Sequence, residues 1–222
     1  MLQQTQVARA IPKYEQFLTL FPTATSLAAT PLGDVLRAWS GLGYNRRAKY
    51  LWQAAQQLSD SFPTDIAALV QLPGIGPNTA GAVLAYSFNQ PVVFIETNIR
   101  TVFIHHFFND QIDVTDKSVL EIVATTLDIE HPREWYWALM DYGAFLKQTV
   151  GNLNQQSKHY AKQSKFEGSK RQIRGEVLRQ LAVSSQTVDE LAKNIVDNRL
   201  RTVIEDLLSE GMIHQSHDKL EL

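Results

Sequence analysis

The pattern of hydrophobic and polar positions predicts a chain of short helices over its first 150 residues. Apolar side chains recur every three or four positions, which is the spacing of one helix face. Two such series are Val7, Ile11, Tyr14, Leu18 and Val35, Ala38, Trp39, Leu42. Only the run PVVFI at residues 91–95 has the composition of a strand. A single run of this kind within a helical domain is more typical of a buried extended connection, so the first domain is predicted to be all-α.

A change in composition after residue 150 predicts a linker and a second, smaller domain. Residues 151–168 are rich in polar side chains and glycine, as connections are. Residues 169–222 then contain three amphipathic series followed by MIHQSHDKLEL, which alternates apolar and polar positions around a turn. Three helices closed by a hairpin is the order of a winged-helix domain. The predicted organisation is a helical domain at 1–150, a linker at 151–168 and a winged-helix-like domain at 169–222.

Composition excludes several classes of protein. The 222 residues provide for one large and one small domain, with 44% hydrophobic and 20% charged residues, as in ordinary globular proteins. No apolar stretch approaches the roughly 18 residues that span a membrane, and the N-terminus lacks the features of a secretory signal. The absence of cysteine excludes disulfides and the usual iron–sulfur ligation. We expect a cytoplasmic monomer with no membrane partner.

The overall charge gives no sign of a nucleic-acid partner, although the basic residues are concentrated in one stretch. The net charge is −2, whereas a phosphate-binding protein is commonly basic. Residues 158–179 hold seven basic side chains against two acidic ones. Such a charge run is more often a solvated linker than a binding surface.

The segment LPGIGPNTA at residues 72–80 has the features of a phosphate-binding turn. Gly74 and Gly76 permit backbone conformations in which amide groups approach a ligand, and Pro77 suits the first position of the next helix. A helix N-terminus with free amides binds anions, so this turn could hold DNA without basic side chains. The alternative is an ordinary tight turn between two helices.

Several spaced motifs resemble one family of DNA-repair enzymes. LPGIGPNTAGAVLAYSFNQPVVFIETNIRTV resembles the helix-hairpin-helix signature and catalytic segment of the MutY and endonuclease III glycosylases. MLQQTQVARAIPKYEQFLTLFPT, LRAWSGLGYNRRAKYLWQAAQ and WALMDYGAFL resemble further MutY segments, in the same order, as far as residue 147. The resemblance implies a helix-hairpin-helix DNA glycosylase fold. It also offers a Na⁺ or K⁺ site at the backbone carbonyls of Val70, Leu72 and Ile75.

The resemblance also implies a catalytic carboxylate. Cleavage of a glycosidic bond passes through an oxocarbenium-like sugar, which a nearby carboxylate stabilises or attacks. The family has an aspartate at the position of Glu96, which keeps the charge but adds a methylene. The alternative is that Glu96 only favours the start of the next helix through its dipole. Asn98 matches a family asparagine near the reacting nucleotide. Asp141 matches a family carboxylate, with a buried, hydrogen-bonded structural acid as the alternative.

Two differences from the family bear on the chemistry. Asn78 stands where lyase-competent relatives carry a Schiff-base lysine, and an amide cannot form that adduct. MutY proteins also carry a general-acid glutamate just before the MLQQT motif, and this chain starts at Met1. Either that glutamate precedes the given sequence, or the protein works without it, and loss of a positioned acid typically costs about 10²–10⁴-fold in rate.

The resemblance implies contacts with double-stranded DNA that holds a mispaired or damaged base. A glycosylase must flip its target base and fill the gap, and Gln4 and Tyr44 match the family's intercalating positions. Gln3 lies near the pocket in the family, and Arg46 and Arg47 are candidate phosphate contacts. The hairpin residues predicted to bind DNA are Leu72, Gly74, Gly76, Asn78 and Thr79.

The C-terminal part departs from typical MutY proteins, which have a four-cysteine cluster and a domain that reads 8-oxoguanine. Here a winged-helix-like domain follows, which contacts either DNA or another protein. The leading hypothesis is a monofunctional glycosylase without a cluster that removes adenine or another mispaired or damaged base. The alternatives are a catalytically impaired relative that binds lesions and a regulator that reads DNA through its winged helix.

Overall fold

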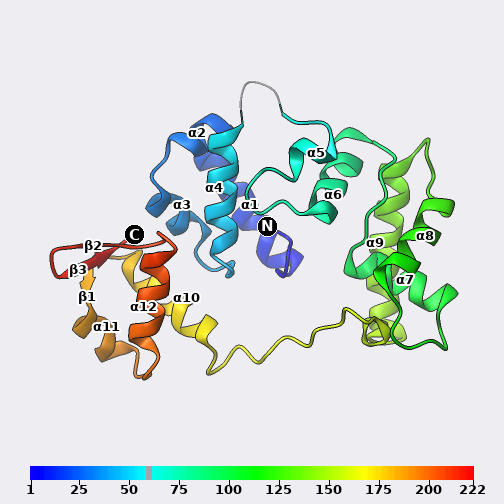
Figure 1. Cartoon of the computed structure of the whole chain (residues 1–222). Coiled ribbons are helices and arrows are strands. Elements are labelled where there is room, and N and C mark those ends of the chain that lie inside the picture. Colours follow the sequence, from blue (N-terminus) through cyan, green and yellow to red (C-terminus); the bar gives the residue numbers. More distant parts are fainter. Residues whose placement is uncertain (59–61) are drawn as a thin grey trace. The chain divides into compact units, whose positions relative to one another are not determined.

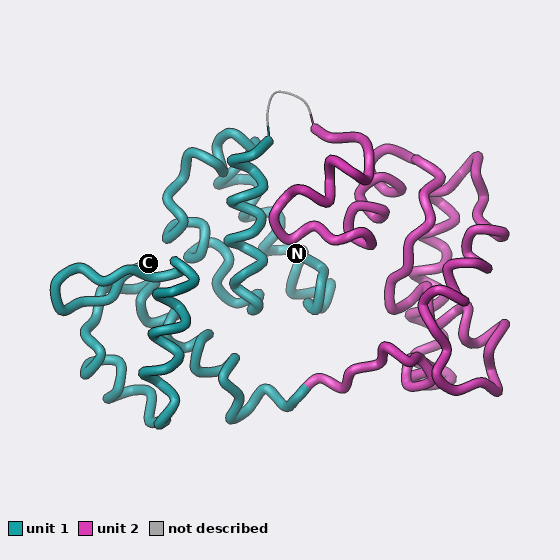
Figure 2. Tube along the Cα trace, in the orientation of Figure 1, with its two compact units in different colours: residues 1–61, 164–222 teal, residues 62–163 magenta. Residues whose placement is uncertain are grey.

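The structure is a computed structural model that describes residues 1–58 and 62–222, and the chain forms two compact units (Figures 1 and 2). Unit 1 combines residues 1–61 with residues 164–222, and unit 2 comprises residues 62–163. This division follows packing, whereas the predicted domain boundaries follow composition and remain a prediction. The first helices of the chain share a unit with its last elements.

Unit 1 joins four N-terminal helices to a small helical domain with a three-stranded sheet. The N-terminal helices are α1 (Val7–Leu20), α2 (Ala24–Ala29), α3 (Leu32–Trp39) and α4 (Arg46–Gln57). The C-terminal elements are α10 (Lys170–Leu181), β1 (Gln186–Thr187), α11 (Val188–Asn194), α12 (Leu200–Ser209), β2 (His214–Ser216) and β3 (Lys219–Glu221). The antiparallel sheet has the order β1-β3-β2. The predicted winged-helix-like domain and its hairpin are therefore confirmed, and the short strand β1 is an addition.

Local signals in the sequence set the limits of these C-terminal elements. The Ser169 side chain accepts a hydrogen bond from the backbone of Gln172 at the start of α10. Thr187 and Glu190 form a reciprocal capping box at the start of α11. Gly211 follows α12 with a φ of +57°, in the left-handed region that glycine adopts without strain.

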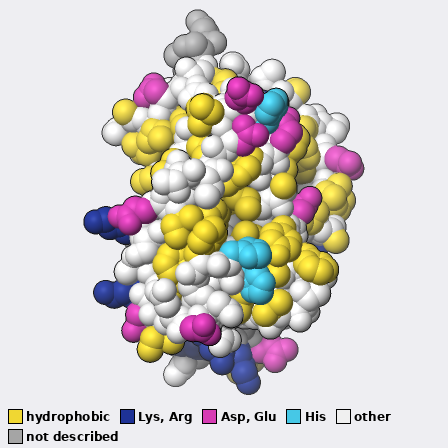
Figure 3. Space-filling view, turned by 90° about the vertical axis from the view of Figure 1, so that its right-hand side faces the viewer, with side chains coloured by type: hydrophobic (Ala, Val, Ile, Leu, Met, Phe, Trp, Pro, Cys, Tyr) yellow, Lys and Arg dark blue, Asp and Glu magenta, His cyan; other side chains and the backbone are white. Residues whose placement is uncertain are grey.

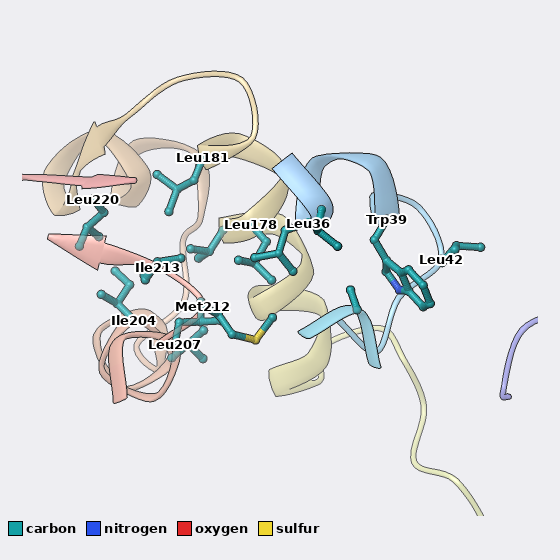
Figure 4. Close-up of a cluster of buried hydrophobic side chains, with 14 of the residues drawn as sticks. Leu36, Trp39, Leu42, Leu178, Leu181, Ile204, Leu207, Met212, Ile213 and Leu220 are labelled. Atoms are coloured by element: carbon teal, nitrogen blue, oxygen red, sulfur yellow. The ribbon is translucent and has the colours of Figure 1, made fainter. Parts of the chain in front are cut away.

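One hydrophobic core runs through both segments of unit 1. Leu178 and Met212 from the C-terminal segment belong to the same buried cluster as Leu36 and Trp39 from the N-terminal helices (Figure 4). Gly33 of α3 lies so close to the chain end that an added Cβ would be 2.7 Å from the Leu222 carbonyl oxygen. The winged-helix-like domain is therefore packed against α3 and is not a separately tethered module.

An ion-pair network adds to this packing. The Glu210 carboxylate accepts hydrogen bonds from Arg46 Nε of α4 at 3.0 Å and from Arg174 of α10 at 2.9 Å. Lys49 donates to the Glu210 backbone carbonyl. The hydrogen bonds from Arg46 and then Arg174 lower the pKa of Glu210 to about 2. Glu210 thereby holds α4 against α10.

Helix α1 forms where the apolar spacing predicts it, but the described structure leaves that face exposed. Ala10 and Phe17 are its buried side chains. The predicted series is exposed by 60%, 51%, 54% and 44% at Val7, Ile11, Tyr14 and Leu18. The periodicity therefore identified the helix without identifying the side that is buried.

Unit 2 contains five α-helices and a 3₁₀ turn within its described residues. These are α5 (Ile66–Leu69), α6 (Pro77–Phe88), α7 (Thr97–Phe107), α8 (Asp116–Thr126), α9 (Pro132–Thr149) and η1 (Leu153–Gln156). Phe94, Ile99 and Tyr136 are among the residues of its core. Across the described parts of both units, no helix is long and apolar enough to cross a membrane.

Helices α7 and α9 are also linked at the surface. His106 Nε2 lies 3.0 Å from Tyr142 Oη, and the two rings stack at 5.6 Å. Phe145 of α9 stacks on Tyr142 and is 56% exposed. Figure 3 shows hydrophobic side chains gathered with histidines on one face of the molecule. This aromatic contact supplements the buried packing of the same two helices.

The polar segment after α9 begins as an ordered part of unit 2. Asn154, within η1, is only 4% exposed. Its amide nitrogen donates to Thr101 Oγ1 at 2.7 Å and to the Thr97 carbonyl at 3.2 Å. Asn154 therefore fixes η1 against the first turns of α7, a role that the polar composition of residues 151–168 did not predict.

We predict that Asn154→Ala lowers the free energy of unfolding by about 1–3 kcal/mol, because it removes one buried and one partly buried hydrogen bond to α7. Urea unfolding of the full chain measures this change. Gln155→Ala, an exposed change in the same turn, is the control and should stay within about 0.5 kcal/mol of the wild type. Equal effects of the two variants would contradict the role of Asn154.

We predict that the stabilisation from Glu210 depends on pH. Its lowered pKa means that the stabilisation is complete above the ordinary carboxyl pKa of 4.5 and is lost as pH falls towards about 2. Glu210→Gln should therefore lower the Tm at neutral pH, and the difference from the wild type should shrink as pH falls below 4.5. Thermal unfolding from pH 7 to pH 3 tests this, with the exposed Glu205→Gln as control. A difference that is independent of pH would rule out the ion pairs as its cause.

Candidate functional site

The carboxylate of Glu96 stands alone at the start of α7. Glu96 is the N-cap residue, with extended backbone at φ −125° and ψ 169°, but its side chain makes no capping hydrogen bond. No ion pair involves it within the described residues. The side chain is half-buried, and this burial raises the pKa of Glu96 above its ordinary value. The carboxylate is therefore partly desolvated and is not used to cap the helix.

The segment that leads to Glu96 is extended, as the sequence predicts for PVVFI, and is held by side chains. Tyr136 Oη donates to the Val92 carbonyl at 2.8 Å and accepts from the Phe94 amide at 3.3 Å. Asn78 Oδ1 accepts from the Ile95 amide at 3.4 Å. Because backbone groups outside helices and sheets need other partners, these contacts fix the segment and with it the position of Glu96.

Tyr86 is a further residue near the site that the sequence did not single out. Its ring packs edge-on against Phe94 at 6.0 Å and Tyr136 at 6.4 Å. Its hydroxyl is buried and has no hydrogen-bond partner among the described residues. Burial, followed by the negative charge of Glu96, raises the pKa of Tyr86. Its position in an apolar helix series gives no signal of this proximity.

Asn98 lies two residues after Glu96, and its side chain contacts the residue before Asp141. Asn98 Nδ2 donates to the Met140 carbonyl of α9 at 3.1 Å. Gly143 permits this close approach, since a Cβ there would be 2.2 Å from the Asn98 carbonyl oxygen. Asp141 is exposed and forms no hydrogen bond or ion pair within the described part of the chain. The alternative of a buried structural acid at this position is therefore wrong, and a catalytic role for Asp141 remains a prediction.

The glycine turn connects α5 to α6 as a compact hairpin. The Ile75 amide donates to the Leu72 carbonyl at 3.1 Å, and Gly74 has a φ of +76°. Gly76 is the N-cap of α6, and Pro77 occupies its first turn. A Cβ at Gly76 would meet no atom within 4 Å, so the backbone faces open space.

The side chains of the hairpin differ in exposure. Gly74, Gly76 and Asn78 are exposed, Thr79 is half-buried and Leu72 is buried. The described residues contain no cluster of three or more histidine or acidic side chains that could hold a metal. A monovalent cation at the carbonyls of Val70, Leu72 and Ile75 remains a prediction, with the Leu72 carbonyl already accepting one hydrogen bond.

In unit 1, both predicted intercalating residues have left-handed backbone. Gln4 has a φ of +59° and Tyr44 a φ of +49°, and both side chains are exposed. Such conformations are rare for residues other than glycine, and strained ones cost about 1–3 kcal/mol each. They persist only when the surrounding structure holds them.

Arg47 provides this support for both loops. Its guanidinium donates to the carbonyls of Met1 and Gln3 in the first loop and to those of Leu42 and Gly43 in the second. It also donates to Thr5 Oγ1 at 3.0 Å. Burial lowers the pKa of Arg47. These bonds occupy the group that was predicted to contact phosphate, so its observed contacts are structural.

The other predicted residues of unit 1 lie beside this arrangement. Gln3 is exposed and contributes its carbonyl to Arg47. Arg46 is exposed but is paired with Glu210. The structure therefore brings Gln3, Gln4 and Tyr44 together around Arg47, and it places Glu96, Asn98 and Asn78 together in unit 2.

Two named proteins are similar in sequence to this chain. An adenine DNA glycosylase from Buchnera aphidicola subsp. Baizongia pistaciae is 36% identical over 66% of this chain and 43% of its own length. An adenine DNA glycosylase from Mycolicibacterium smegmatis is 30% identical over 98% of this chain and 83% of its own length. The chain thus spans less than half of the first relative but most of the second.

Solved structures of similar fold include a thermostable thymine-DNA glycosylase, with a TM-score of 0.55 and 21% identity over 64% of this chain and 69% of the other. A trapped endonuclease III–DNA covalent intermediate has a TM-score of 0.56 and 20% identity over 67% of this chain and 70% of the other. They confirm the predicted glycosylase fold. The family model of the HhH-GPD superfamily base excision DNA repair protein matches residues 1–125. The chain therefore belongs to the HhH-GPD superfamily of base excision DNA repair proteins.

Proposed function

We propose that this protein is a monofunctional DNA glycosylase that hydrolyses the N-glycosidic bond of a flipped, mispaired or damaged base, with adenine as the first candidate. The observation that carries the proposal is the uncapped, half-buried carboxylate of Glu96 in a chain of this superfamily. The names of the relatives favour adenine.

In the proposed reaction, the bond between C1′ of deoxyribose and the base nitrogen breaks, and water adds to C1′. The sugar passes through an oxocarbenium-like state, whose positive charge the ionised Glu96 stabilises. Partial burial strengthens this interaction because less water screens it. The products are the free base, which gains a proton, and an abasic sugar in the intact strand.

Unit 2 also supplies groups that position the DNA strand. Backbone amides of the exposed turn at Gly74 and Gly76 would bind a phosphate at the N-terminus of α6. The Asn78 amide cannot form a Schiff base, so hydrolysis without strand cleavage by that route is expected. Asn98, fixed by the Met140 carbonyl, lies two residues from Glu96 and would orient the reacting nucleotide.

Unit 1 would distort the duplex. Tyr44 and Gln4 are exposed on strained loops that Arg47 holds, which suits side chains that enter the space left by a flipped base. We assign Arg47 to the support of these loops and keep Arg46 as a candidate phosphate contact that would first have to exchange its ion pair with Glu210.

We predict that Glu96→Gln lowers the excision rate by about 100-fold or more, because it removes the charge opposite the sugar cation. Glu96→Asp should remain active, since it keeps the charge. The full chain is incubated with duplexes that carry single mispaired or damaged bases, and alkali then reveals abasic sites. Glu134→Gln, an exposed acid on α9, is the control.

The rate should also depend on pH through Glu96. The ionised form is needed, so the rate should fall as pH drops through the pKa of Glu96, which burial places above the ordinary value of 4.5. This acidic limb should be absent from the residual activity of Glu96→Gln. If the protein binds lesions but excises a base from none of the duplexes, it is a lesion-binding relative. Equal rates for Glu96→Gln and wild type would remove Glu96 from the mechanism.

A further inference from the structure

The winged-helix-like domain reaches the predicted intercalating tyrosine. Arg171 of α10 donates from Nη1 to Tyr44 Oη at 2.8 Å, and its guanidinium carbon lies 5.8 Å from the centre of the Tyr44 ring. Its other terminal nitrogen donates to the Ser164 carbonyl at 2.7 Å. Arg171 is half-buried and forms no ion pair within the described residues. The Arg171 side chain thus links Tyr44 to Ser164 in the segment that precedes α10.

The contacts within its own loop leave the hydroxyl end of Tyr44 without a hydrogen bond. The residue is 38% exposed and has a φ of +49°. Arg47, whose guanidinium lies 5.4 Å from the ring centre, binds the Leu42 and Gly43 carbonyls just before Tyr44 but makes no hydrogen bond to the hydroxyl. Arg171 is the residue that fixes the free end of the ring.

Arg171 is itself in a fixed place. Three residues further along α10, Arg174 binds Glu210, which also binds Arg46 of α4. Between them, Ile173 belongs to the hydrophobic core that both segments of unit 1 share. The start of α10 therefore has a defined position relative to the loop that carries Tyr44. The bond from Arg171 to Tyr44 belongs to this packing of α10 within unit 1.

We propose that Arg171 is a positioning residue for lesion recognition: the winged-helix-like domain holds the Tyr44 ring ready to enter the duplex beside the flipped base. This proposal rests on the proposed function, since it assigns Tyr44 a role in DNA distortion. It differs from a phosphate contact by Arg171, because a phosphate contact requires only the positive charge, whereas positioning requires the forked guanidinium that reaches Ser164 and Tyr44 together.

The experiment compares the full-length wild type with Arg171→Gln, Arg171→Lys, Tyr44→Phe and the double variant Arg171→Gln/Tyr44→Phe. Fluorescence anisotropy gives the Kd for an intact duplex and for one with a tetrahydrofuran abasic analogue, at several salt concentrations. The ratio of the two Kd values measures lesion preference. Lys193→Gln, which removes one positive charge elsewhere in the C-terminal segment, is the matched control.

We expect Arg171→Gln and Tyr44→Phe each to lower the lesion preference by about ten- to a hundredfold, which is the range for loss of one hydrogen bond to a charged group. The double variant should lose no more than either single variant, because both remove the same bond. Arg171→Lys should not restore the preference. Lys193→Gln should leave it unchanged.

Three results would overturn the proposal. One is a uniform loss of affinity for both duplexes, with a salt slope reduced by about one and rescue by Arg171→Lys, which identifies a phosphate contact. A second is additive losses in the double variant. The third concerns protein labelled with fluorotyrosine and measured without DNA. The ¹⁹F resonance of Tyr44, which is assigned by its loss in Tyr44→Phe, would be the same in Arg171→Gln as in the wild type. Wild type with neither excision nor lesion preference would reject the proposed function itself, whereas an active wild type with any of these three results rejects only Arg171.

Discussion

Backbone outside helices and sheets must find hydrogen-bond partners, and this constraint shapes both candidate sites. In unit 1, the guanidinium of Arg47 satisfies carbonyls from two loops that are forty residues apart in sequence, such as those of Gln3 and Gly43. In unit 2, Tyr136 and Asn78 serve the extended segment before Glu96. The candidate side chains therefore lie on irregular backbone, and a few polar groups fix the conformation of that backbone.

The two sites differ in how their charges are used. Arg47 is partly desolvated, and its terminal nitrogens bind four carbonyls and the Thr5 hydroxyl, so its charge orders the chain itself. Glu96 is also partly desolvated but has no ion pair in the described structure, which leaves its charge for a ligand. Glu210 is a third case, in which two arginines compensate one carboxylate and join helices from distant parts of the sequence. All three charged groups are at least partly buried. The structural ones, Arg47 and Glu210, have hydrogen-bond or ion-pair partners, and the candidate functional one, Glu96, has no ion pair in the described structure.

Much of the fold could be predicted from local patterns. The C-terminal helices bury their predicted apolar faces, as at Val177 and Leu181. These side chains pack in the core that the C-terminal segment shares with the N-terminal helices. The hairpin follows from alternation around a short turn. The exposed face of α1 could not be predicted, because periodicity reports that one side of a helix is apolar and not what covers it.

The candidate sites were only partly predictable for a related reason. Motif resemblance identified Glu96, Asn98, Gln4 and Tyr44 as candidates, since these lie in recognisable local sequences. It could not show that Arg47 is occupied by carbonyls. Nor could it show that Asn154 packs on α7 or that Tyr86 lies near Glu96, because a local motif does not show how separate elements pack against each other.

The discontinuity of unit 1 has a consequence for biosynthesis. Its N-terminal helices leave the ribosome long before α10 and α12, which complete their shared core. Unit 2, being continuous, can fold first, while Leu36 and Trp39 still lack the part of their core that the C-terminal segment supplies. Closing a loop of this length costs entropy that grows only slowly with its size, but the nascent helices stay exposed to aggregation and chaperones throughout the wait.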